Sequence, residues 1–153
     1  MIRVLAALII AACSTAAYAQ DSTRWVQLKG DALREAYSGQ TLDLVYNDKG
    51  FTNIAHHTEM HFPDGRTDYR EGEFRLNGHW KLVGAPGLED QICYRYPQLD
   101  ETRQHCFFIF RDGRCLYGYP SRYYGHVKNI IPEGWRSKGA NREDGPSCDI
   151  LIS

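Results

Sequence analysis

The residues best suited to chemistry in this chain are His57, Glu59 and His61, which occupy alternate positions of one short segment. If that segment is a β-strand, the three side chains point to the same face, about 7 Å apart from one to the next. Two imidazoles and a carboxylate form a competent ligand set for zinc, but ligands along one straight strand converge poorly on a single ion. We therefore interpret this face as the solvent-exposed side of an edge hairpin, with a metal site at these three residues as the alternative.

The opposite face of the same segment carries His56 and Met60, two side chains that copper accepts as ligands. A single pair of this kind is more often core filling, and we interpret it so. The chain has no serine in a G-x-S-x-G motif and no glycine-rich phosphate loop. We therefore predict no catalytic residue and no cofactor, and a small hydrolase with an unrecognised site stays as a third hypothesis.

A second group of candidate residues combines tyrosine with arginine, the residue types that are enriched in binding surfaces. The predicted ligand-binding residues are Tyr94, Arg95, Tyr96, Tyr117, Tyr119 and Tyr123. The alternative is that these tyrosines fill the core of a barrel and place their hydroxyls at its rim. The net charge of the whole chain is −1, and no block of basic residues stands out, which argues against nucleic acid as a partner.

The first 19 residues predict a secretory signal peptide. Arg3 precedes an apolar run from Val4 to Ala12, and Ala17-Tyr18-Ala19 is an A-x-A cleavage site. Cleavage there leaves residues 20–153 as one domain, without a later transmembrane run, in the periplasm or outside the cell. The alternative is a lipoprotein in which Cys13 is the lipidated anchor, because Ile10 to Cys13 resembles a bacterial lipoprotein box.

Export has a consequence for the cysteines. Loss of the leader removes Cys13 and leaves Cys93, Cys106, Cys115 and Cys148. An even number of cysteines in an exported chain implies two disulfides, with three possible pairings. The strand register described next favours Cys93–Cys106 and Cys115–Cys148. A metal site made of all four thiolates is the alternative, although the spacing contains no C-x-x-C pair.

The fold is organised around the stretch from Ile92 to Tyr119, which contains three aromatic-rich runs separated by turn residues. Such a pattern is typical of consecutive antiparallel strands. Asp112-Gly113 predicts a tight hairpin that sets Phe110 opposite Cys115, and an earlier, longer loop lets Cys93 lie opposite Cys106. Both faces of the middle strand are apolar, so we expect both to be covered.

The rest of the chain predicts one short helix and several further strands. The helix spans Asp31 to Gly39, with Asp31 as its N-cap, and its Leu33 and Tyr37 should dock on the sheet. The predicted strands are Thr41–Tyr46, Phe51–Phe62, Arg66–Arg70 and a hairpin of Glu73–Leu76 with His79–Val83 about Asn77-Gly78, and the tail is irregular from about residue 120. The predicted fold class is therefore mainly β: an antiparallel meander that closes into a small barrel or sandwich of about seven or eight strands, with one short N-terminal helix.

Several short motifs carry a resemblance to known proteins. They are Ser38-Gly39-Gln40-Thr41, Phe62-Pro63-Asp64-Gly65, Gly78-His79-Trp80, Ile92-Cys93-Tyr94 and Cys106. Together they resemble a family of small exported bacterial β-proteins of unknown function, which implies export and an all-β body. The Gly78-x-Trp80 step is also similar to the motif that opens lipocalins. We therefore expect an exported, non-catalytic β domain that binds a small ligand, an envelope component or a protein partner; its oligomeric state stays open.

Overall fold

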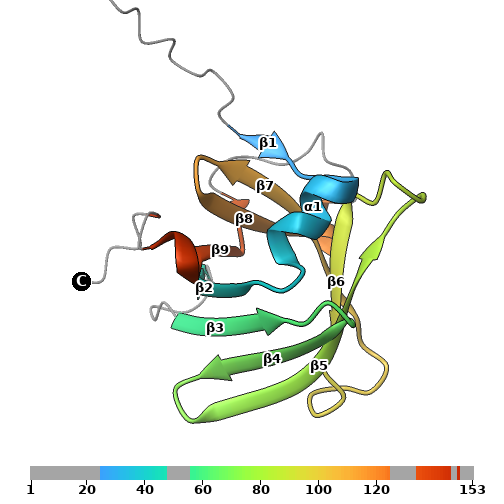
Figure 1. Cartoon of the computed structure of the whole chain (residues 1–153). Helices are drawn as coiled ribbons and strands as arrows, with labels where there is room; N and C mark the ends of the chain where they lie inside the picture. Colours follow the sequence, from blue (N-terminus) through green and yellow to red (C-terminus); the bar gives the residue numbers. More distant parts are fainter. Residues whose placement is uncertain (1–24, 48–55, 125–133, 146–147, 149–153) are drawn as a thin grey trace, which may run out of the picture.

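Nine β-strands form one antiparallel sheet in the computed structural model, which describes residues 25–47, 56–124, 134–145 and 148 (Figure 1). The strands are β1 Val26–Gln27, β2 Thr41–Tyr46, β3 His56–His61, β4 Arg66–Glu71, β5 Phe74–Val83, β6 Gln91–Arg95, β7 His105–Asp112, β8 Cys115–Pro120 and β9 Ser137–Asn141. The helices are α1 Gly30–Tyr37, α2 Ser121–Tyr124 and the 3₁₀ helix η3 Arg142–Asp144.

The sheet closes on itself because β8 pairs with β9 on one side and with β7 on the other. Strands β2 to β9 thus form an eight-stranded antiparallel barrel, and β1 is an extra strand that pairs with the second half of β7. Closure removes the exposed strand edges that an open sheet would present. The predicted mainly β, antiparallel fold class is confirmed, and of the two predicted arrangements, barrel and sandwich, the structure is the barrel.

The central hairpin of β7 and β8 has a register two residues away from the predicted one. Asp112 lies opposite Cys115, so that Phe110 faces Tyr117 instead of Cys115. The loop consists of Gly113 and Arg114, and Gly113 takes the positive φ of 58° that a tight turn needs. A shift by two residues leaves every side chain on its predicted face, because side chains alternate with a period of two.

Strand β7 is covered on both faces, as its apolar pattern predicts. Ile109 is buried inside the barrel together with residues of the other strands and of α1. Phe108 points outward, where it forms a separate buried cluster with Phe110 and Tyr119. That outer cluster is covered by partly buried aromatic rings, which come from Trp25, Tyr117 and Trp135.

Helix α1 covers one end of the barrel (Figure 1), where its Leu33 and Tyr37 are buried as predicted. The helix begins at Gly30 and Lys29 is its N-cap without a side-chain hydrogen bond, so the prediction of Asp31 as N-cap is wrong. Asp31 lies in the first turn instead, where its charge favours the helix dipole. At the other end, Gly39 takes a φ of 78°, and its N–H donates to the carbonyl oxygen of His61 at 2.7 Å. The end of α1 is thereby fixed to the end of β3.

The predicted hairpin about Asn77-Gly78 is wrong, because β5 runs without a break from Phe74 to Val83. The chain turns earlier, between Glu71 and Phe74, where Gly72 has a φ of 57°. Gly78 serves a different purpose: a Cβ there would meet the ring of Tyr96 at 2.5 Å. The glycine therefore makes room for an aromatic ring packed across the strand.

The C-terminal region contains a strand that the sequence did not predict. Residues 137–141 form β9, which lies between β2 and β8 and completes the barrel. Its sequence, Ser-Lys-Gly-Ala-Asn, has little β-propensity. Gly139 allows the close approach that is needed here, since a Cβ at this position would collide with the backbone of Asp43 and Leu44. The prediction of an irregular tail from about residue 120 is thus wrong for this segment.

Two disulfides join the four cysteines in the predicted pairing. Cys93 and Cys106 lie directly opposite each other on β6 and β7, with Cα atoms 4.0 Å apart. Cys115 and Cys148 have Cα atoms 5.3 Å apart, and their bond ties residue 148 to the start of β8. Such bonds persist in oxidising compartments, which is compatible with export.

We expect no reactive thiol in protein that is produced without residues 1–19, because all four remaining cysteines are paired. The measurement is a titration of thiols after unfolding in denaturant without reductant. Two reactive thiols per chain would contradict the pairing. Peptide mapping provides the finer check, since Cys93 joined to Cys148 would show that the strand register is wrong.

Three predictions fall on residues that the structure does not describe. They are the signal peptide of residues 1–19, the lipoprotein alternative at Cys13, and the first part of the strand predicted from Phe51. For the described part of the chain, no helix has the length and apolar character needed to cross a membrane.

Candidate ligand-binding cavity

The side chains of His57, Glu59 and His61 point into the barrel, so their predicted exposure on an edge hairpin is wrong. Their exposed fractions are 5%, 5% and 0%. The outward face of β3 carries His56 and Met60 instead, and both are exposed, so the prediction of core filling is also wrong. The reason is that β3 is not an edge strand: it lies between β2 and β4 in the closed sheet, and the barrel interior accepts its polar face.

A cavity of about 730 Å³ occupies the barrel interior. Aromatic side chains from five strands and from α1 contribute to its lining: Tyr37, Tyr46, Tyr69, Phe74, Tyr94, Tyr96 and Phe107. Tyr37 belongs to the end that α1 covers. Phe74, Leu99 and Arg122 also line the cavity and are exposed to solvent, so the cavity reaches the surface at the opposite end.

Stacked rings build one wall of the cavity. The imidazole of His57 lies between Tyr46 and Tyr69, with ring centroids 4.2 Å and 4.9 Å away and interplanar angles of 13° and 27°. Tyr69 then meets Tyr96 edge to face at 6.1 Å. Tyr46, His57 and Tyr69 alternate with outward-facing residues on β2, β3 and β4, and Tyr96 directly follows β6, so the barrel brings these four side chains together.

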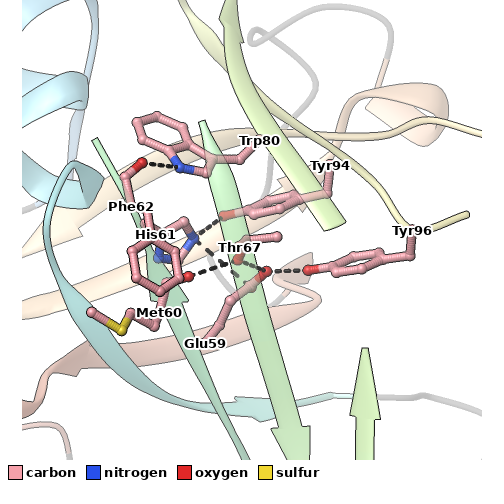
Figure 2. Close-up of polar contacts among 8 residues, drawn as sticks. All are labelled: Glu59, Met60, His61, Phe62, Thr67, Trp80, Tyr94 and Tyr96. Atoms are coloured by element: carbon pink, nitrogen blue, oxygen red, sulfur yellow. Dashed lines mark hydrogen bonds and ion pairs between the residues drawn. The ribbon is translucent and has the colours of Figure 1, made fainter. Parts of the chain in front are cut away.

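Glu59 is a buried carboxyl group in this otherwise aromatic region (Figure 2). Its Oε1 accepts hydrogen bonds from the hydroxyls of Tyr96 and of Thr67, the latter at 3.0 Å. Burial disfavours the charged form and raises the pKa of Glu59 to about 7, against the opposing effect of these two hydrogen bonds. Glu59 therefore changes its charge near neutral pH.

His61 lies beyond the cavity, between the strands and α1. Its Nε2 shares a hydrogen bond of 2.9 Å with the Tyr94 hydroxyl (Figure 2). Its ring meets Tyr37 and Trp80 edge to face. Burial lowers the pKa of His61 to about 3, so the imidazole is neutral at physiological pH. Trp80 is held in turn by a hydrogen bond of 2.9 Å from its Nε1 to the carbonyl oxygen of Phe62.

The three polar side chains of β3 do not converge on one point. His61 Nε2 is 3.9 Å from Glu59 Oε2, whereas the His57 ring is stacked between two tyrosines. Within residues 25–47, 56–124, 134–145 and 148, no group of three or more histidine, cysteine, aspartate or glutamate side chains is placed to hold a metal ion.

The predicted ligand-binding residues divide between three places. Tyr94 and Tyr96 line the cavity, whereas Tyr117 and Tyr119 belong to the aromatic cluster outside the barrel. The remaining two, Arg95 and Tyr123, are exposed on the surface.

Sequence reasoning missed the roles of Tyr37, Tyr46, Tyr69 and Glu59 in the cavity. The pattern around Tyr69 carried a usable signal, because Thr67 and Tyr69 alternate with the charged residues Arg66, Asp68 and Arg70. Such alternation predicts that the tyrosine points to the buried face.

Comparisons of the chain with known proteins identify no relative. No family model, no curated protein and no solved structure matches it. The resemblances to small exported β-proteins and to lipocalins therefore stay predictions, and the function has to be inferred from the cavity itself.

Proposed function

We propose that this protein is an exported, non-catalytic binding protein that holds a small, largely apolar ligand inside its barrel. The observation that carries the proposal is the aromatic cavity of about 730 Å³ that reaches the surface at one end. Binding pockets for small molecules have volumes of about 300–1,000 Å³ and are lined mostly by apolar and aromatic side chains with a few polar groups. The barrel interior meets each of these conditions.

The distribution of apolar surface favours a small ligand over a protein partner. The aromatic cluster on the outside of β7 and β8 is already covered by Trp25 and Trp135. Several large apolar residues are exposed among the described residues, and Phe74 and Leu99 are at the mouth of the cavity. The other four, Val26, Met60, Leu88 and Tyr123, do not line the cavity, so the mouth is where exposed apolar side chains adjoin an apolar cavity.

The test is binding of a neutral aromatic dye, N-phenyl-1-naphthylamine, whose fluorescence rises in apolar surroundings. We expect saturable binding of one dye per chain. Leu76→Trp puts a larger side chain into the cavity lining and should weaken binding about tenfold or more. Its matched control is Leu88→Trp, because Leu88 is exposed and does not line the cavity.

A second variant tests the mouth without disturbing the core. Ser121 lines the cavity from α2 and is only partly buried, so Ser121→Trp should slow entry or weaken binding while the protein melts as the wild type does. Equal dye binding by the wild type and by both cavity variants would place the dye elsewhere. Absence of dye binding to the wild type would contradict the proposal.

A further inference from the structure

Among the described residues, no group donates a hydrogen bond to Oε2 of Glu59. The hydroxyls of Thr67 and Tyr96 both bond to Oε1. His61 Nε2 is 3.9 Å from Oε2, which is too long for a hydrogen bond. Because Glu59 lines the cavity, Oε2 can accept a hydrogen bond from a ligand inside it.

Tyrosine rings surround this carboxyl group. Tyr94 and Tyr96 are parallel within 4°, with centroids 6.3 Å apart, and both line the cavity. Burial, and after it the charge of Glu59, raises the pKa of both hydroxyls, so the rings stay neutral. The faces of neutral aromatic rings attract cations, above all where water is excluded.

Fixed positive charge is confined to the mouth of the cavity. Of the described lysines and arginines, only Arg122 and Arg136 line it. Arg122 is an exposed residue of α2, and Arg136 donates a hydrogen bond to the carbonyl oxygen of Asn47, just after β2 ends. His61 supplies no charge, because its pKa is about 3. The inner part thus holds a carboxyl group without a permanent cation beside it.

We infer that the ligand carries a positively charged amine on an apolar body, and that the amine binds to Glu59 among the tyrosine rings. This inference rests on the proposed function and names the chemical class of the ligand. A carboxylate in an aromatic surrounding selects an ammonium group by a charge-assisted hydrogen bond and by cation–π attraction. The apolar body of the ligand then fills the rest of the cavity, toward Phe107 and the mouth.

The competing possibility is an anionic ligand whose head group meets Arg122 and Arg136 at the mouth. A matched series of three compounds distinguishes the two: 4-phenylbutylamine, 4-phenylbutan-1-ol and 4-phenylbutanoate, measured by calorimetry at pH 8. We expect the amine to bind about tenfold or more tightly than the alcohol, as a charge-assisted hydrogen bond allows. The carboxylate should bind most weakly.

Glu59→Gln keeps the shape of the side chain and an acceptor for Thr67 and Tyr96, but removes the charge. The affinity of this variant for the amine should be about tenfold or more lower than that of the wild type, and its affinity for the alcohol should be nearly unchanged. The control is Asp68→Asn, which removes the same charge from the outer face of the neighbouring strand β4. That variant should bind all three compounds as the wild type does.

The pH dependence of the wild type is a second measurement that needs no variant. The amine stays charged up to about pH 10, so its affinity should rise roughly tenfold or more from pH 5.5 to 8.5 as Glu59 ionises. The titratable or charged groups around Glu59 are His57 and His61 on β3, Tyr37 on α1, Tyr46 on β2, Tyr69 and Glu71 on β4, Tyr94 on β6, Tyr96 directly after β6, and Arg136 before β9. The dependence should vanish in Glu59→Gln; if it persists there, another of these groups is responsible and the inference is wrong.

The outcomes also separate this inference from the proposed function. If the alcohol binds as tightly as the amine or more tightly, the inference of an amine ligand is wrong, but the proposed function of a ligand-binding barrel stands. If the carboxylate binds most tightly, the inference is also wrong, and the ligand is an anion that binds to the arginines at the mouth. If none of the three binds while the naphthylamine dye does, the inference fails alone; if the dye fails as well, the proposed function fails with it.

Discussion

Replacing Phe108 with alanine should lower the free energy of unfolding by about 3–5 kcal/mol, as the truncation of a buried phenylalanine does. Phe108 is only 3% exposed and packs with Phe110 and Tyr119 under the rings that cover the outer face of β7. Because a small domain is stable by only about 5–15 kcal/mol, the melting temperature should fall by many degrees. Urea denaturation of the oxidised protein measures the change.

Two further substitutions make this result specific. Phe74→Ala removes the same atoms from a side chain that is 51% exposed, and it should cost well under half as much. Ile109→Ala probes the inner face of the same strand, with an expected cost of about 2–5 kcal/mol. We expect the lower end of that range, because Ile109 already borders the cavity and loses fewer packing contacts. Small effects of both Phe108→Ala and Ile109→Ala would contradict the central place of β7.

The second large effect concerns the dependence of stability on pH, to which Glu59 and His61 contribute with opposite signs. The pKa of Glu59 is raised from 4.5 to about 7, so its contribution to stability is complete below pH 4.5 and is lost as the pH rises to 7. The pKa of His61 is lowered from 6.5 to about 3, so its contribution is complete above pH 6.5 and is lost as the pH falls to 3. Between pH 4.5 and 6.5 the two slopes offset each other.

Glu59→Gln should expose the slope that His61 contributes. The stability of this variant should rise with pH between 4.5 and 6.5, whereas these two groups leave the wild type nearly flat over the same range. Relative to the variant, the wild type should lose about 3 kcal/mol between pH 4.5 and 7, which is the free energy that corresponds to the change in the pKa of Glu59. Chemical denaturation at several pH values measures both curves, and parallel curves would show that Glu59 ionises in the folded protein as it does in water.

The sequence by itself determined the features that depend on local residue patterns and on residues close to one another in the chain. Alternating apolar residues and turn glycines predicted an antiparallel meander that closes into a barrel or sandwich, and β2 and β4 were predicted to within one residue. The pairing of all four cysteines also followed, because the two β7 hairpins bring Cys93 opposite Cys106 and leave Cys115 for Cys148. The predicted register of β7 and β8 was wrong by two residues, but Phe108 and Ile109 were still assigned to the correct faces.

Only the tertiary structure decided which face of each strand is inside. The pattern of β3 shows that His57, Glu59 and His61 share a face, but barrel closure, completed by the weakly β-prone β9, turns that face inward. The residue pattern of a strand shows which side chains share a face, but not which face points into the barrel, and a polar face is normally assigned to solvent. The cavity is likewise a property of closure, since Tyr46, Tyr69 and Tyr96 are far apart in the sequence. Asn77-Gly78 shows the same limit: it has the composition of a turn, yet the space taken by Tyr96 makes Gly78 a packing residue in a continuous strand.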